Sequence, residues 1–145
     1  MRSVYFCTMH PRAIVTYPPA LQLTRILDAP VEFTWKAITE PDHVAKWWGP
    51  DGFSVSISKM DVAPGGEWNL VLHGHDGTDF PNRIIYGDVR KHERLVLNYQ
   101  TTPKHLTIVD FEARGNETWI RWHMTFESEE QLTQMLNEFQ VDKGL

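Results

Sequence analysis

The sequence predicts an α+β fold in which an antiparallel sheet of seven strands packs against helices. Three observations support this fold class. Six consecutive segments with alternating apolar residues lie between residues 53 and 126, and turn residues separate them. One more alternating segment precedes them, and helical patterns lie near both ends of the domain. Because the apolar face of such a sheet has to be covered, we expect two layers in the order strand, two helices, six strands and helix.

The first 20 residues differ from the rest of the chain. They hold the single cysteine, Cys7, and the stiff Pro18-Pro19 pair. The β-prone run from Ala13 to Tyr17 favours one edge strand in this part. We therefore expect residues 1–20 to be an N-terminal extension and residues 21–145 to form the domain.

The first strand of the domain and the two helices after it are predicted from apolar patterns and prolines. Alternating residues over Leu21–Leu27 predict the strand. Pro30 and Pro41 each start a helix, because proline is well tolerated at the first helical position. The second helix ends at Trp47-Trp48-Gly49-Pro50, with glycine and proline as the stop signal. The apolar face of the first helix is expected to consist of Val31, Trp35 and Ile38.

The long middle part of the chain is predicted to be a meander of short strands. Pro64-Gly65-Gly66 and the Asp76-Gly77 pair mark two of its turns. The strands are expected at Phe53–Ser58, Glu67–His73, Ile84–Asp88, Leu95–Tyr99, His105–Ala113 and Trp119–Phe126. The side chains expected to face the helix layer are those of Trp68, Leu70, Leu72, Ile84, Tyr86, Leu97, Tyr99, Val109, Phe111, Ile120, Trp122 and Met124.

A last helix is predicted from Glu129 onward. Ser128 is a natural N-cap, and Gln131 follows it in a capping-box position. The helix would present an apolar stripe made of Leu132, Met135, Leu136 and Phe139.

Composition and charge argue against several classes of function. The chain has 145 residues and a net charge of −5, which argues against binding to nucleic acid through its phosphates. No apolar run reaches the length of a membrane span, and the N-terminus has no secretory signal. A single cysteine gives neither an intramolecular disulfide nor a Cys-rich zinc pattern. We expect a soluble cytoplasmic protein without cofactor or metal.

Nine short motifs are spread along the chain: Leu23-Thr24-Arg25, Asp28-Ala29-Pro30, Trp35, Thr39-Glu40-Pro41-Asp42-His43, Trp47-Trp48-Gly49-Pro50, Gly65-Gly66, Gly74 to Thr78, Pro81-Asn82-Arg83 and Glu93-Arg94-Leu95. In this order and spacing they resemble the activator of Hsp90 ATPase homologue 1-like (AHSA1-like) family. This family belongs to the START-like, or Bet v 1-like (SRPBCC), superfamily. The resemblance covers about residues 21–145.

The resemblance implies a helix-grip fold, in which a curved antiparallel sheet wraps around a long C-terminal helix and leaves a cavity between them. Relatives in the superfamily bind lipids, sterols, plant hormones or polyketides, and some are cyclases or dehydratases. The chain departs from the family in its N-terminal extension and at residues 139–145, so that we expect the C-terminal helix to be short or truncated. A sheet face left open in this way predicts that a second subunit in a homodimer, or residues 1–20, covers it.

We expect a small apolar or amphipathic ligand to bind between the sheet and the helices. Aromatic residues suit such a site, because a phenol or an indole gives both an apolar wall and a hydrogen bond. The residues expected to line the site are Trp47, Trp48, Trp68, Leu70, Tyr86, Tyr99, Phe111, Trp122 and Met124. For the tryptophan pair two interpretations stay open, a structural plug that seals the loop and the lip of a cavity.

Two other groups of residues suggest catalysis or protein interaction. Asp88 shares the inward register of Tyr86, so it lies either at the rim of the sheet or inside as the buried acid of a cyclase- or dehydratase-like enzyme. Trp119 and Arg121 on the opposite face would suit a chaperone-related interaction module. No Ser-His-Asp or Cys-His set stands out, so the sequence favours binding over catalysis and assigns no catalytic residue.

A third group has the residue types of a metal site. His73, His75, Asp76 and Asp79 lie close together in the sequence. The turn residues among them favour a mobile hairpin tip, whereas zinc needs rigidly held ligands. We therefore assign no metal site here.

Overall fold

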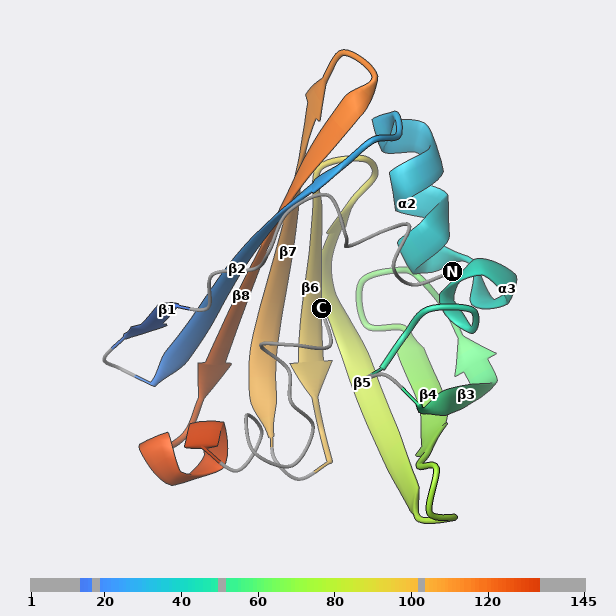
Figure 1. The fold of residues 1–145 in the computed structure, drawn as a ribbon, viewed down its shortest axis with the longest axis vertical. Coiled ribbons are helices and arrows are strands. Elements are labelled where there is room, and N and C mark those ends of the chain that lie inside the picture. Colours follow the sequence, from blue (N-terminus) through green and yellow to red (C-terminus); the bar gives the residue numbers. More distant parts are fainter. Residues whose placement is uncertain (1–13, 17–18, 50–51, 102–103, 134–145) are drawn as a thin grey trace.

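The computed structural model describes residues 14–16, 19–49, 52–101 and 104–133. Its central feature is one antiparallel sheet of eight strands, which Figure 1 shows fanned out beside two helices. The strands are β1 (Ile14–Thr16), β2 (Ala20–Leu27), β3 (Ser54–Met60), β4 (Glu67–His73), β5 (Asp79–Arg90), β6 (Arg94–Tyr99), β7 (His105–Arg114) and β8 (Glu117–Phe126). The helices are α2 (Val31–Thr39) and α3 (Pro41–Val44).

The strand order across the sheet is β1-β2-β8-β7-β6-β5-β4-β3. From β3 to β8 the chain forms the predicted meander, and β2 lies beside β8 to complete the seven strands expected. The short strand β1 pairs with β2 and is the edge strand predicted within residues 13–17. The predicted α+β class with a curved antiparallel sheet is therefore confirmed, with one short strand added at its edge.

The strand β5 is longer than the sequence pattern predicts. We expected a start at Ile84, whereas pairing with β4 begins at Asp79, which lies opposite His73. The first half of β5 contains Pro81, and proline weakens a strand signal because it cannot donate to the ladder. The β4–β5 pair is consequently a long hairpin that forms one side of the sheet.

One face of the sheet, called the inner face below, carries the core. The twelve residues predicted on inward positions lie on it, and all are buried except Tyr99, which is partly buried. Trp35 of α2 packs against Phe111 of β7, with ring centroids 5.2 Å apart. Helix α2 therefore covers the inner face near the β7–β8 hairpin (Figure 1). Among the described residues, no helix has the length and apolar character needed to cross a membrane.

The last described residues begin the predicted C-terminal helix. Residues 129–133 are helical, and the Ser128 hydroxyl oxygen accepts a hydrogen bond from the Gln131 backbone N–H at 3.2 Å. Leu132 is buried in the core. The rest of the apolar stripe and the predicted truncation lie outside the described residues, as does Cys7.

Candidate functional site

The two tryptophans after α3 have different environments. Trp47 is buried, and its indole N–H donates a hydrogen bond to the Ala37 carbonyl oxygen at 2.8 Å, which ties the loop to α2. Trp48 is only partly buried, and the chain turns after it at Gly49, where φ is +93°. Trp47 thus has the contacts of a structural plug, whereas Trp48 is directed at the sheet.

Trp48 contacts two tryptophans from distant strands of the inner face. Its ring centroid lies 4.8 Å from that of Trp68 on β4 and 5.9 Å from that of Trp122 on β8. In a flat sheet these strands would be about 19 Å apart, because four strand spacings of about 4.8 Å separate them. The contacts instead bring the two indoles within about 11 Å of each other. The sheet is therefore curved around Trp48.

Four buried polar atoms on the inner face have no hydrogen-bond partner among the described residues. They are the indole nitrogens of Trp68 and Trp122, the hydroxyl of Tyr86 and the hydroxyl of Thr107. A buried polar group without a partner costs about 1–3 kcal/mol, so native proteins keep few of them. These atoms come from β4, β8, β5 and β7, and they mark the inner face as the candidate site.

The phenols of the inner face are held neutral. Burial raises the pKa of Tyr86 and of Tyr99 above the ordinary value, and for Tyr86 the nearby Tyr99 and Asp61 add to this effect. The Tyr86 ring is parallel to the Trp68 indole, with centroids 6.3 Å apart and an interplanar angle of 5°. Tyr86 therefore offers a neutral hydroxyl next to an unpaired indole N–H.

A cation is buried on the same face. Arg25 has an exposed fraction of 0% and lies on β2 opposite Ile120 of β8. Burial lowers the pKa of its guanidinium to about 10, so it remains charged at neutral pH. The guanidinium donates a hydrogen bond to the Thr24 carbonyl oxygen at 3.3 Å. The sequence signal for it was a charged residue at an apolar position of a strand pattern, and we assigned it no role.

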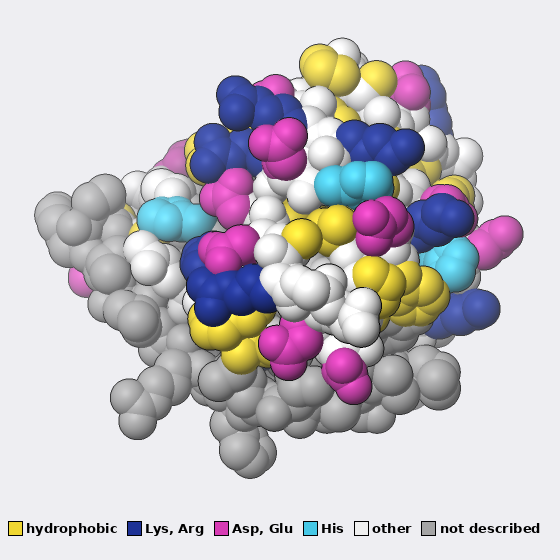
Figure 2. Space-filling view, turned by 90° about the horizontal axis from the view of Figure 1, so that it is seen from above, with side chains coloured by type: hydrophobic (Ala, Val, Ile, Leu, Met, Phe, Trp, Pro, Cys, Tyr) yellow, Lys and Arg dark blue, Asp and Glu magenta, His cyan; other side chains and the backbone are white. Residues whose placement is uncertain are grey.

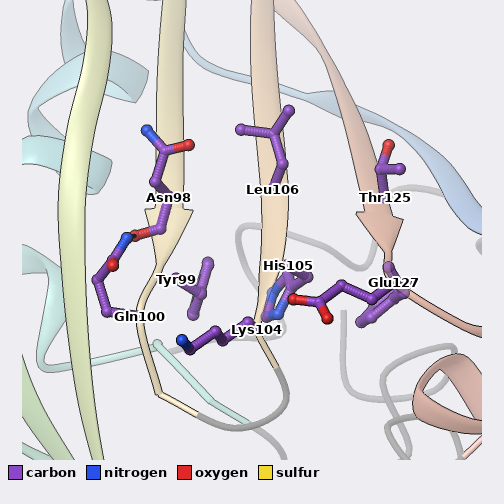
Figure 3. A pocket seen from close by; sticks show the side chains of 9 residues that line it. Asn98, Tyr99, Gln100, Lys104, His105, Leu106, Thr125 and Glu127 are labelled. Atoms are coloured by element: carbon purple, nitrogen blue, oxygen red, sulfur yellow. Dashed lines mark hydrogen bonds between the residues drawn. The ribbon is translucent and has the colours of Figure 1, made fainter.

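At one end of β6, β7 and β8 an open depression of about 350 Å³ indents the molecule (Figure 3). The His105 ring is stacked between Tyr99 and Phe126, at centroid distances of 3.9 Å and 4.9 Å. This stack forms the aromatic wall of the depression. Its lining is completed by Asn98, Gln100, Lys104, Leu106, Thr125 and Glu127.

The structure brings some of the predicted site residues together and separates others. Trp47, Trp48, Trp68, Tyr86 and Trp122 form one connected aromatic cluster, which we call the Trp48 cluster.

The remaining predicted site residues have other neighbours. Tyr99 stacks on His105 at the depression, and Phe111 packs against Trp35. The buried residues Leu70 and Met124 contribute apolar surface to the inner face, on β4 and β8.

The predicted inward register of Asp88 is wrong. A β-bulge lies between Tyr86 and Val89, so Val89, and not Asp88, continues the inward alternation opposite Leu95. The Asp88 carboxylate is 41% exposed and forms an ion pair with Arg90 at 2.7 Å. It is therefore not a buried acid, and this observation removes the basis for a cyclase-like mechanism through Asp88.

His73 lies in a hydrogen-bonded chain that the sequence did not reveal. Its Nε2 is 2.8 Å from the Ser56 hydroxyl, and its Nδ1 is 2.7 Å from the Asp79 carboxylate. Ser56 of β3 lies opposite Val71 of β4, so that His73 is its diagonal neighbour although 17 positions of sequence separate them. This is why no motif showed the contact.

The hydrogen-bonded side chains of Ser56, His73 and Asp79 have the connectivity of a Ser-His-Asp triad. Ser56 and Asp79 are exposed, however, on the face of the sheet opposite the core. Triads work where the protein excludes water and stabilises an oxyanion. Exposure favours a surface network, and we assign no catalysis to it. Among the described residues, no group of three or more His, Cys, Asp or Glu side chains could hold a metal ion.

The outer face of the sheet carries paired charges. The Arg114 guanidinium covers the Trp119 ring at 3.7 Å, and Glu112 forms ion pairs with both Arg114 and Arg121. Trp119, the residue predicted for protein interaction, is thus covered by a charged neighbour. Basic and acidic side chains are also interspersed on the end of the molecule seen in Figure 2.

Comparison with known proteins agrees with this architecture. The family profile described as activator of Hsp90 ATPase homolog 1-like protein matches residues 28–144 of the chain. None of the curated proteins matches it.

Solved structures with the same architecture come from several bacteria. Protein Ms6760 from Mycobacterium smegmatis has a TM-score of 0.80 at 20% identity, covering 90% of this chain and 87% of that one. A protein from Arthrobacter aurescens has a TM-score of 0.81 at 20% identity, covering 94% and 85%. The AHSA1-like protein from Aeromonas hydrophila has a TM-score of 0.68 at 20% identity, covering 82% and 84%. At these identities the likeness establishes the fold.

Proposed function

The chain belongs to the activator of Hsp90 ATPase homolog 1-like family, and from this premise we propose that it binds one small apolar or amphipathic molecule at the inner face of its sheet, without catalysis. The fold is one that commonly binds ligands. The observation that carries the proposal is the set of four unpaired polar atoms on the inner face, three of which belong to members of the Trp48 cluster. A bound molecule would supply partners that the described residues do not supply.

The aromatic surroundings support the apolar part of the ligand. Trp48, Trp68 and Trp122 converge from a loop and two distant strands. Rings at these distances form an apolar wall on which a planar molecule can stack. Trp48 is the partly exposed member, so it is our candidate for the lip of the site, while Trp47 anchors the loop.

The expected affinity follows from the area that such a ligand can bury. About 200 Å² of apolar ligand surface contributes roughly 5 kcal/mol at about 25 cal/mol per Å², before the cost of ordering the ligand. Binding is therefore expected to be weak to moderate, and hydrogen bonds would be needed for selectivity.

Tryptophan emission provides the test. We expect fatty acids or aromatic compounds to quench the emission of the wild-type protein in a saturable titration. The Trp48→Ala substitution should weaken this binding about tenfold, because one wall of the site is lost. Trp119→Phe is the matched control, since Trp119 lies on the outer face beneath Arg114, and its affinity should equal that of the wild type. Unchanged emission and no calorimetric heat across the panel would overturn the proposal.

Three companion proposals concern the context of the site. We propose that residues 1–20 act as an extension to a ligand-binding domain of residues 21–145, that the protein is cytoplasmic, and that it is a homodimer. A light-scattering mass equal to that of a monomer would contradict the dimer.

A further inference from the structure

We infer that the molecule bound at the inner face carries uncharged hydrogen-bond acceptors, such as ketone oxygens, which accept from the unpaired donors of Trp68, Tyr86 and Trp122. This inference rests on the proposed function and names the chemical class of its ligand. It starts from the kind of polar atom that the inner face leaves without a partner.

Two of the four unpaired atoms can act only as donors. The indole nitrogens of Trp68 and Trp122 have one N–H each and no lone pair available to accept a hydrogen bond. The hydroxyls of Tyr86 and Thr107 can donate as well. A ligand that offers only donors, such as an ammonium group, would leave both indoles unpaired. The complementary ligand group is an acceptor.

The four atoms lie on neighbouring strands of the curved face. Tyr86 and Thr107 both lie opposite Leu97, one on each side of β6. Trp68 stacks beside Tyr86, while Trp122 approaches Trp68 through their common contact with Trp48. Side chains that are far apart in the sequence are therefore grouped around one region of the inner face.

The environment disfavours an ionised ligand group. Burial keeps the Tyr86 phenol neutral, and the same loss of hydration would act against a buried carboxylate. The cation on this face, Arg25, is engaged within the protein, in part through a hydrogen bond to the Thr24 carbonyl oxygen. A neutral carbonyl oxygen accepts the available hydrogen bonds without the larger desolvation cost of a charge.

The body of the ligand follows from the rings around these donors. Trp48 contacts both Trp68 and Trp122 at distances typical of aromatic packing. A planar aromatic body would stack on them and place a substituent oxygen near the indole and phenol donors. The chemical class is consequently an aromatic ketone or a compound of similar shape.

The test compares three naphthalene probes of closely similar shape, using quenching of tryptophan emission with calorimetry as a second readout. The probes are 2-acetylnaphthalene with a ketone, 2-ethylnaphthalene without an acceptor, and 2-naphthoate with a charge. We expect the wild-type protein to bind the ketone at least tenfold more tightly than the hydrocarbon, and more tightly than the carboxylate.

Conservative variants locate the acceptor contact. Tyr86→Phe and Trp68→Phe remove a donor but keep a ring, so each should reduce the ketone-to-hydrocarbon ratio several-fold while the hydrocarbon still binds. Trp119→Phe is the matched control, because the Trp119 indole N–H is also unpaired but its ring lies on the outer face beneath Arg114. Its ratio should remain that of the wild type.

The outcomes separate this inference from the proposed function. Equal affinity for ketone and hydrocarbon would overturn the acceptor but leave ligand binding intact. Tighter binding of 2-naphthoate would overturn the neutral character of the ligand. A ratio that falls as much in Trp119→Phe as in Trp68→Phe would overturn the assigned donors. Absence of binding by every probe and by the broader panel would overturn the proposed function as well.

Discussion

The two faces of this sheet differ in how their polar atoms are paired. On the outer face, Arg94 donates two hydrogen bonds, of 2.6 Å and 3.2 Å, to the Asp110 carboxylate. The Glu67 carboxylate on the same face accepts hydrogen bonds from both Arg83 and Asn69. On the inner face, four buried polar atoms have no partner among the described residues. These charged groups of the outer face are paired although water is available to them, and one buried polar atom of that face, the Trp119 indole nitrogen, has no partner among the described residues. The inner face has four such atoms, where water is scarce.

This contrast indicates that the inner face is not arranged for stability alone. Leucine or phenylalanine at these positions would avoid the cost of the unpaired atoms, about 1–3 kcal/mol each. Unpaired buried groups in a native protein call for a functional explanation. A ligand at the inner face provides one, and substitutions on the two faces test it.

The largest difference in the free energy of unfolding is expected between alanine variants of two tryptophans of β8 that lie on opposite faces. Trp122→Ala removes a ring that is buried in the core and contacts Trp48, so it should reduce the free energy of unfolding by about 3–5 kcal/mol. Trp119→Ala removes a partly buried ring that lies beneath Arg114, and it should cost about 1–2 kcal/mol. Urea unfolding of both variants measures the difference. Equal losses would mean that the outer face carries as much of the packing energy as the inner one.

Substitutions of two buried threonines are expected to give smaller changes in the free energy of unfolding, with opposite signs. The Thr118 hydroxyl donates to the Ala29 carbonyl oxygen at 2.8 Å, whereas the Thr107 hydroxyl is unpaired. Thr118→Val should therefore cost about 1–2 kcal/mol of unfolding free energy, and Thr107→Val should be neutral or stabilise by about 1 kcal/mol. Both residues have an exposed fraction of 0%, which makes them a matched pair.

Urea unfolding without ligand decides this second prediction. A loss of stability in Thr107→Val similar to that in Thr118→Val would show that the Thr107 hydroxyl has a partner in solution, such as a buried water. Thr107 would then no longer count among the unpaired groups, and the contrast between the two faces would weaken.

Much of the fold was predictable because strand periodicity and turn residues are local signals. The alternation around Trp68, Tyr86 and Trp122 predicted which side chains share the inner face, and the register agrees. The prediction was wrong at Asp88, because a bulge adds one residue without changing the local pattern of residue types. Hydrophobic patterns indicate the face of a residue only as long as the register is unbroken.

The candidate site was less predictable, because hydrogen-bond partners are properties of the folded chain. The sequence suggested Trp48, Trp68 and Trp122 as lining residues. Trp48 contacts the other two rings, however, only because the sheet curves so that β4 and β8 both approach it. It did not single out Thr107, whose only distinction is the lack of a partner. The Ser56–His73 contact escaped for the same reason, since cross-strand register produced it.

The smallest expected effect is on the pH dependence of stability, through the carboxylates of the outer face. Hydrogen bonds from Arg114 and Arg121 hold the pKa of Glu112 below its ordinary value, and those from Arg83 and Asn69 do the same for Glu67. Because the folded-state pKa is the lower one, these carboxylates add stability above their ordinary pKa. That stability is lost as the pH falls from about 5 through the folded-state value.

Glu112→Gln combined with Glu67→Gln should therefore flatten the acid side of the stability profile. The double variant should be slightly less stable than the wild type at about pH 6, and the difference should vanish as the pH falls through the folded-state pKa, as measured by urea midpoints. Glu93→Gln is the control, because the Glu93 side chain is exposed and makes no ion pair among the described residues. The effect should remain small, since exposed ion pairs are screened by water and salt. An acid profile unchanged by the double variant would place the acid sensitivity elsewhere, and the pairing of the outer face would then contribute specificity of register more than stability.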